Sequence, residues 1–257
     1  MNEVNGSSDS VTSNYVLENY IYPRGKSVED RSAAKLKLLS TSILRGYNIY
    51  DSASVFCQEI DLGGFADLRS GQIGLDFASK FIDRFGGLKR RPSERGLPNT
   101  ILDRLKSPEG LPMAEVLFQA ILSVEHSMAF VMGRLGAIDY SEIKTAPTPE
   151  RAFLVWSYRV PGVSRRAAEV GLIGFNELLP EELRQQAGVV DGGFDAAYRS
   201  LRTYARRWRI SNLNTSITLR AAEKRGIPWE LIEGQLARLG QGKFQRHVNN
   251  SATDRTS

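Results

Sequence analysis

The sequence has very little cysteine and histidine. Cys57 is the one cysteine, and His126 and His247 are the two histidines. A lone cysteine forms no intrachain disulfide, which is typical of a chain kept in a reducing compartment. Structural and catalytic zinc sites draw on three or more His, Cys or carboxylate ligands, so few such sites are open to this chain. A Ser-His-Asp triad assembles only in space, and with two histidines we do not favour one.

Long apolar runs and the common nucleotide motifs are also missing. No uninterrupted apolar stretch reaches the roughly 18 residues of a membrane span, and the polar first residues lack the apolar core of a secretory signal. We therefore expect a cytoplasmic protein without a membrane partner. The chain has no GxxxxGK[ST] phosphate loop, no GxGxxG after a strand, no GxSxG elbow and no CxxC pair. We expect no complete catalytic site in this chain.

The overall composition is that of a folded protein with a slightly basic surface. Hydrophobic residues make up 41% and charged residues 25%, which is close to the average of globular domains. Lys and Arg number 34 against 29 Asp and Glu, a net charge of +5. This mild excess favours an ordinary solvated surface over a dedicated polyanion-binding protein.

The hydrophobic pattern predicts an α+β fold. Residues 1–34 are polar and form a predicted disordered extension. Strands are predicted within 36–50, 54–62 and 152–160, where β-forming residues gather. Helices are predicted from Phe77 to Phe85 and over 100–106, 113–132 and 165–179, where apolar residues recur at helical spacing. We assign residues 35–185 to a mixed α/β domain.

The remaining residues divide into a predicted linker helix and a short C-terminal piece. Residues 186–210 contain an amphipathic stretch, 194–208, which we interpret as a linker helix. In 211–257, a helix over 217–225 is followed by Gly226 and Pro228, the usual punctuation of a helix end. Short strands are predicted at 228–233 and 243–248.

Two polar groups on predicted helices invite a functional interpretation. Glu115, Gln119 and His126 project from one side of the long helix and could form a metal or acid/base cluster, although a solvated stripe is the interpretation we prefer. On the linker helix, arginines interleave with Tyr204 and Trp208 and could contact a polyanion; again we prefer a solvated face. The arginines are Arg199, Arg202, Arg206, Arg207 and Arg209.

The tail carries a glycine-flanked polar turn. Gly240 and Gly242 precede Lys243, Gln245 and Arg246. Backbone amides in such a turn can bind an anion. As a generic pattern this is weak, but the order of residues around it is more specific.

Four stretches together resemble the cyanophycin synthetase family, in the family's order and over residues 36–257. The tail resembles the entrance to its ATP-grasp module, and AAEKRGIPW, ILRGYNIY and EIDLGGFAD resemble three earlier stretches. The tail residues that match are Leu239, Gly240, Gly242, Gln245, Arg246, Thr253, Thr256 and Ser257. The upstream residues that match are Ala222, Glu223, Arg225, Gly226, Ile227, Pro228 and Trp229, and near the front Leu44, Arg45, Gly46 and Asn48.

The resemblance implies the N-terminal part of an ATP-dependent amide ligase that builds a polymer of aspartate and arginine. On that map, 35–185 is the family's N-terminal domain and 211–257 is the incomplete start of an ATP-grasp module. Phosphoryl chemistry needs positioned cations and hydrogen-bond donors. ATP and magnesium are therefore expected only for a longer, complete ligase. The expected role is scaffolding, or holding the polymer at a basic surface with Arg45, Asn48, Arg90 and Arg91.

The long helix departs from the family pattern. Many relatives carry an HxxEH element there that could hold a metal for hydrolysis. In this chain Glu115 stands at the first histidine, and Phe118 and Gln119 at the Glu-His pair. A metal-bound water needs both ligands and a base, so we expect no hydrolytic site here.

Two alternatives stay open at the level of sequence. One is a stand-alone metal-dependent hydrolase of a peptide-like polymer, and the other is a basic nucleic-acid-binding protein, whose binding should weaken steeply with salt. Partners other than the polymer would be downstream ligase modules or further copies of the chain, since a homo-oligomer is compatible with the sequence.

Overall fold

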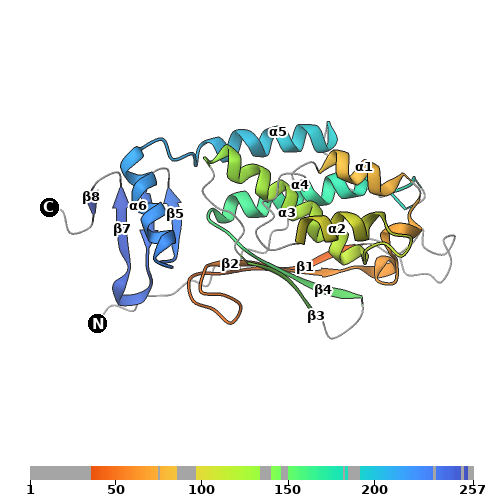
Figure 1. The fold of residues 1–257 in the computed structure, drawn as a ribbon, viewed down its shortest axis with the longest axis horizontal. Helices are drawn as coiled ribbons and strands as arrows, with labels where there is room; N and C mark the ends of the chain where they lie inside the picture. The colour runs from red at the N-terminus through yellow and green to blue at the C-terminus, as the bar shows by residue number, and fades with distance from the viewer. Residues whose placement is uncertain are drawn as a thin grey trace.

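The computed structural model confirms the α+β class. In the part of the chain that the structure describes, a four-stranded antiparallel sheet carries five helices, and a second four-stranded sheet carries one (Figure 1). The predicted extension 1–34 lies outside the described residues, and so do Arg90 and Arg91. The structure describes residues 36–74, 76–85, 97–133, 140–145, 150–181, 183–184, 192–233, 236–249 and 252–253.

The first sheet contains the three predicted strands and one more. Its order is β1-β2-β4-β3, with every neighbouring pair antiparallel. The missed strand is β3, an edge strand in which Glu142 and Lys144 flank Ile143; charged edge strands are common because they discourage pairing with other chains. The bounds are β1 (Lys37–Leu44), β2 (Val55–Asp61), β3 (Ser141–Thr145) and β4 (Arg151–Ser157).

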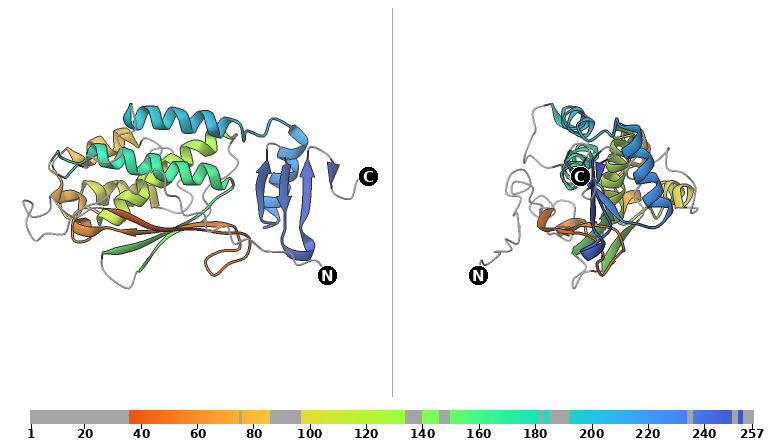
Figure 2. Two further views of the ribbon diagram at one scale, coloured as in Figure 1. Left: turned by 180° about the vertical axis from the view of Figure 1, so that it is seen from behind. Right: turned by 90° about the vertical axis from the view of Figure 1, so that its left-hand side faces the viewer.

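Within the described residues, the helices cover one face of this sheet (Figures 1 and 2). Phe56, Gln58 and Ile60 of β2 alternate with less buried residues and are themselves buried. The ring of Phe56 lies 4.8 Å from that of Trp156 on β4. The period of two puts these side chains on one face of the sheet, where the core forms.

The helices over the first sheet fall where the periodicity predicted them. Helix α4 begins earlier than expected because Pro161 occupies its first turn, where a missing N–H costs no hydrogen bond. Helix α5, predicted as a linker, packs against α4 and buries Phe194, Leu201 and Ala205. The bounds are α1 (Phe77–Arg84), α2 (Leu97–Lys106), α3 (Met113–Val131), α4 (Pro161–Leu178) and α5 (Gly193–Arg206).

The preferred interpretation of Glu115, Gln119 and His126 as a solvated stripe is wrong for Gln119, which is buried, whereas Glu115 and His126 are partly exposed. Thirteen of the 19 residues of α3 are buried, including Gln119, Ser123 and Glu125. By length and composition α3 is also the one helix in the described part of the chain that could cross a membrane. Its position between the sheet and the other helices accounts for an apolar composition on nearly all sides.

The C-terminal unit is an antiparallel meander with α6 packed against it. Asn212 caps α6 by accepting hydrogen bonds from the amides of Asn214 and Thr215 (2.8 and 3.2 Å), so the helix begins before the predicted 217. Gly226 has a φ of 65°, as its predicted place after the helix requires. The bounds are α6 (Leu213–Lys224), β5 (Trp229–Glu233), β6 (Leu236–Leu239), β7 (Arg246–Asn249) and β8 (Ala252–Thr253).

Two details of this unit were not predicted correctly. Strand β6 was missed, because LARL is too short to show an alternating pattern. The predicted strand 243–248 is instead a 3₁₀ turn, Gly242–Phe244, followed by β7.

A carboxyl group is buried between α3 and α4. Glu125 is 5% exposed, and its Oε1 accepts a hydrogen bond from Ser164 Oγ at 2.7 Å. Burial raises the pKa of Glu125 to about 7, against the opposing effect of the Ser164 hydrogen bond. The folded state therefore keeps this proton at pH values where the unfolded chain, with a pKa near 4.5, has lost it. Stability falls as the pH rises through this interval and stays lower above it.

We predict that Glu125→Gln removes this dependence. The wild-type chain should lose roughly 3 kcal/mol of unfolding free energy between pH 4.5 and pH 8 through this one group, because each unit of pKa shift corresponds to about 1.4 kcal/mol. Urea denaturation at a series of pH values measures it, with the exposed Glu223→Gln as the matched control. Parallel pH profiles for wild type and Glu125→Gln would contradict the assignment.

Candidate functional site

A small cavity of about 200 Å³ lies where the loop after β1 meets the turn between β6 and β7. We call it the joint pocket. It brings Arg45, from the first sequence motif, next to the glycine turn of the last. Its lining residues are Arg45, Gly46, Ser54, Pro228, Trp229, Glu230, Arg238, Gly240, Gln241, Gly242 and Gln245.

Asn48 organises the loop on one side of the joint pocket. Its Nδ2 donates to the carbonyls of Gly46 and Ala53 (2.7 and 2.8 Å), and its Oδ1 accepts from the amides of Tyr50 and Asp51 (2.9 and 3.1 Å). The φ of 74° at Gly46 starts the turn. Because the amide group is used by the loop itself, we assign Asn48 a structural role and leave it out of any binding surface.

The turn on the other side is closed by its own backbone. The amide of Gly240 donates to the carbonyl of Pro228 (2.8 Å). The amide of Phe244 donates to the carbonyl of Gln241, and the amide of Gln245 donates to the carbonyl of Gly242 (both 3.1 Å). These three amides are therefore unavailable to an anion.

Gln241 joins the two sides. Its Oε1 accepts from the amide of Tyr47 (2.6 Å) and its Nε2 donates to the carbonyl of Ser52 (3.0 Å). A Cβ on Gly46 would lie 2.8 Å from the Gln241 side chain, so glycine permits this close approach. We call the region where these two parts of the chain meet the joint. It includes a further hydrogen bond, which the amide of Leu231 donates to the carbonyl of Arg159 (3.2 Å).

A buried acid lies beside the joint pocket. Glu230 is 7% exposed, forms an ion pair with Arg238 and accepts a hydrogen bond from Ser54 Oγ (3.4 Å). The Ser54 hydroxyl also accepts from the amide of Gly46 (2.9 Å). Burial, with the negative charge of Glu230, raises the pKa of the nearby Tyr158 to about 12, so this phenol stays neutral at physiological pH.

The remaining predicted tail residues lie around the turn in different environments. Lys243 is exposed, with its ammonium group 5.1 Å from the ring of Phe244. Arg246 Nη1 donates to the carbonyl of Gln245 (2.7 Å). Thr253 belongs to β8, and Ser257 lies outside the described residues.

The α3 residues do not come together as a metal cluster. Both Oε atoms of Glu115 accept hydrogen bonds from the Arg104 guanidinium on α2 (3.0 and 2.9 Å). Phe118 packs against Trp156 of the sheet, and Gln119 is 7% exposed. In the residues that the structure describes, no group of three His, Cys, Asp or Glu side chains is placed to hold a metal ion.

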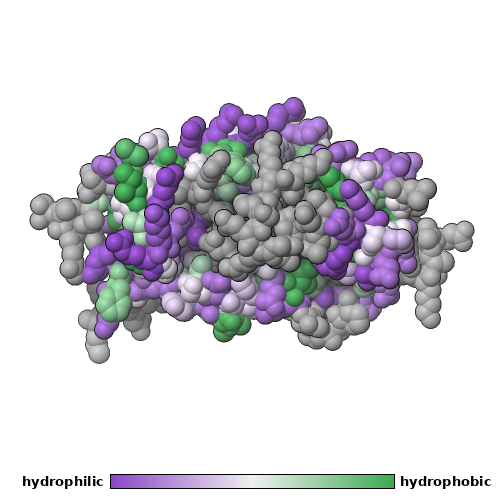
Figure 3. All heavy atoms as spheres, viewed as in Figure 1, coloured by the Kyte–Doolittle hydropathy of each residue, from purple (hydrophilic) through white to green (hydrophobic). Residues whose placement is uncertain are grey.

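The arginines of α5 form an exposed ridge. Arg199, Arg202 and Arg206 are exposed, and hydrophilic side chains line the edge of the molecule where α5 runs (Figure 3). Tyr204 does not point outward with them, because the guanidinium of Arg166 on α4 covers its ring at 4.4 Å. The predicted interleaving of arginine and aromatic groups on one exposed face is therefore not formed at Tyr204.

The sequence did not indicate Gln241, Ser54 or Glu230 as site residues. Gln241 lies between two glycines in the tail motif, which was the one available signal. Ser54 and Glu230 take part only because two distant segments meet. Comparison with protein families and with curated proteins finds no match for the chain.

We predict that Gln241→Ala loosens the joint without unfolding the protein. Both lost hydrogen bonds are exposed, so the cost should be about 1–2 kcal/mol. Amide hydrogen exchange at Tyr47 should speed up at least about tenfold, since its acceptor is gone. Gln245→Ala is the control, because the Gln245 side chain lies in the same turn and its Nε2 is 3.3 Å from His247 Nε2. Equal effects of the two substitutions would refute the role of Gln241.

Proposed function

We propose that this chain is the N-terminal part of a cyanophycin-synthetase-like, ATP-dependent amide ligase and that it holds the aspartate–arginine polymer. In such a ligase, ATP activates a carboxylate and an amine attacks the acyl phosphate. Those steps would belong to downstream modules, and ATP and magnesium are expected only there. This chain would supply the scaffold and a surface for the polymer.

The observation that carries this proposal is the contact between the first and the last motif. Gly46 and Gln241 are nearly two hundred positions apart in the chain, yet their segments line one pocket and exchange hydrogen bonds through Tyr47 and Ser52. Motifs chosen only for their resemblance had no other reason to meet. Their meeting supports reading them as parts of one functional region.

The rim of the joint pocket offers what a zwitterionic polymer requires. Arg45 is exposed at the rim, and a guanidinium can bind a carboxylate through two parallel hydrogen bonds. Tyr47, Ile49 and Phe244 are 76%, 87% and 73% exposed and belong to the two segments that meet there. Large exposed apolar side chains beside an arginine are typical of a binding surface.

The size of the joint pocket argues for polymer holding over nucleotide binding. Sites that enclose a drug-sized ligand usually have about 300–1,000 Å³, more than the 200 Å³ found here. The pairing of Glu115 with Arg104 likewise favours holding over hydrolysis, because it engages both carboxylate oxygens of the residue that stands at the first histidine of the family's HxxEH element.

Co-sedimentation with the insoluble aspartate–arginine polymer at low salt tests the proposal. Wild-type chain should sediment with the polymer, and Arg45→Gln should weaken binding about tenfold, because a charged hydrogen bond contributes about 1.5–3 kcal/mol. Arg199→Gln, an exposed arginine on α5, should bind like wild type. Failure of the wild-type chain to sediment with the polymer would overturn the holding role.

The mass of the native protein tests the ligase assignment separately. Intact mass spectrometry on the protein from its own cells should give a value far above 28.6 kDa. A native mass of 28.6 kDa would contradict membership of a longer ligase and would leave polymer binding as the question.

A further inference from the structure

Helix α5 and the residues just after it carry a concentration of positive charge that the rest of the chain lacks. Five arginines lie between positions 199 and 209, and this stretch contains no Asp, Glu or Lys. Without these five, the remaining 29 Lys and Arg equal the 29 Asp and Glu in number. The net charge of +5 of the whole chain is thus matched by this one stretch.

Three of the five form what we call the arginine ridge: Arg199, Arg202 and Arg206. They are three and four residues apart on α5, so their side chains leave the helix on one side over a length of about 10 Å. All three are exposed, while Phe194 and Leu201 on another face of the helix are buried. Figures 1 and 2 show α5 as the helix farthest from the first sheet, so the ridge lies at the outer edge of the helical layer.

Within the described part of the chain, no carboxylate pairs with the arginine ridge, whereas Arg84, for example, pairs with Glu177. Asp195, one turn before Arg199, is the nearest acid along the helix and bounds the ridge at that end. Like charges three and four residues apart destabilise a helix. The fold therefore bears a repulsion that an external polyanion would relieve.

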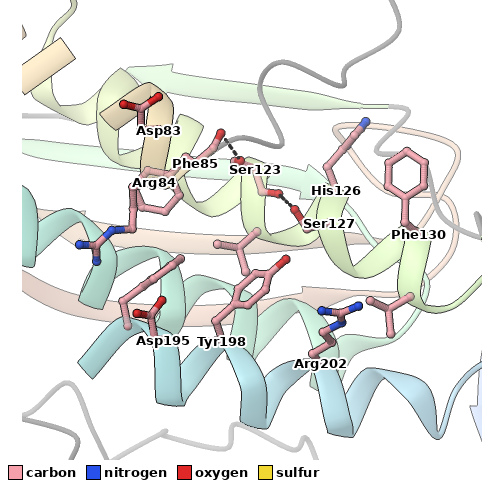
Figure 4. A pocket seen from close by; sticks show the side chains of 13 residues that line it. Asp83, Arg84, Phe85, Ser123, His126, Ser127, Phe130, Asp195, Tyr198 and Arg202 are labelled. Atoms are coloured by element: carbon pink, nitrogen blue, oxygen red, sulfur yellow. Dashed lines mark hydrogen bonds between the residues drawn. The ribbon is translucent and has the colours of Figure 1, made fainter. Parts of the chain in front are cut away.

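A hollow of about 520 Å³ between α3 and α5 lies beside the arginine ridge, since Arg202 is one of its lining residues. Figure 4 shows that Tyr198 and Arg202 both project from α5 into this hollow. A phenol and a guanidinium are each hydrogen-bond donors to an anion. A phosphate group at the mouth of the hollow would therefore meet donors from both side chains.

The aromatic side chains of this region do not form a stacking platform for unpaired bases. The ring of Tyr198 stacks on Phe194 with centroids 5.6 Å apart, and the guanidinium of Arg166 covers Tyr204 at 4.4 Å. Trp208 is half-buried, with its ring 6.4 Å from that of Tyr204. Surfaces for single strands combine positive charge with exposed aromatic rings. Guanidinium groups alone favour a duplex, whose phosphates face outward, because they bind phosphate oxygens through two parallel hydrogen bonds.

We propose that the arginine ridge is a binding surface for double-stranded DNA, which it contacts through phosphates and without regard to base sequence. B-form DNA carries one negative charge per about 1.7 Å of its axis, so a ridge about 10 Å long can reach several phosphates. The wide major groove of B-form DNA admits an α-helix, whereas that of duplex RNA is deep and narrow. Contacts to phosphate position a protein on the duplex but carry no sequence information.

Fluorescence anisotropy with a labelled DNA duplex of random sequence tests the proposal on the full chain. The logarithm of the association constant should fall linearly with the logarithm of salt concentration between about 50 and 200 mM, with a slope of about −2.7 for three phosphate contacts. Arg206→Gln should weaken binding about tenfold at about 50 mM salt and make the slope shallower by about 0.9, because one contact is lost. Arg220→Gln, which removes the same charge from an exposed position on α6, is the matched control and should bind like wild type.

Should Arg206→Gln disturb the end of α5, Arg199→Gln tests the same ridge one turn away from the start of the helix. It should weaken DNA binding about tenfold while its binding to the aspartate–arginine polymer stays unchanged, so this proposal and the polymer-holding role can fail separately. Duplex RNA, single-stranded DNA and poly-glutamate, added as competitors, should each displace the duplex less well than unlabelled duplex DNA does.

Four results would each overturn the proposal. They are absence of binding at about 50 mM salt, an association constant that does not change with salt, equal losses in Arg206→Gln and Arg220→Gln, and competition by poly-glutamate equal to that by duplex DNA. The last result would mean that the arginine ridge binds acidic chains in general.

Discussion

The arrangement of the helices depends on how closely α4 approaches its neighbours at two glycines. A Cβ on Gly171 would lie 2.9 Å from the Cα of Ile121 on α3, and one on Gly174 would lie 2.6 Å from the Phe194 ring on α5. Backbone and packed rings cannot yield that space cheaply. Helix α4 is thus held between α3 and α5. The contact sets the distance at which Ser164 reaches Glu125.

The same helix connects the core to the joint. The residues between β4 and α4 include Arg159, whose carbonyl accepts from Leu231 and whose guanidinium stacks 4.8 Å from the ring of Trp229. The remaining link is mostly polar and runs through Gln241. Each such hydrogen bond contributes about 1 kcal/mol net, little beside the 5–15 kcal/mol of a whole domain. Local opening of the joint therefore costs little free energy, which is compatible with the polymer-holding role that we propose.

Local pattern predicted the helices well, because each has a buried face that its own sequence displays. Phe77, Phe81 and Phe85 are an example, and all three are buried. Pattern failed where tertiary context decides the environment. Gln119 looks like part of a solvated face, yet α3 is enclosed on nearly all sides. Strand β3 looks like a loop, yet it completes a sheet edge beside β4. The joint pocket could be guessed only as two separate motifs, since nothing in either states that Gln241 reaches Tyr47.

The arginines of this protein differ in whether a carboxylate of the protein neutralises them. Arg84 on α1 pairs with Glu177 on α4, and Arg104 on α2 pairs with Glu115 on α3, so each pair joins two helices. Arg45, by contrast, is exposed at the rim of the joint pocket, and the proposed holding of the polymer depends on it.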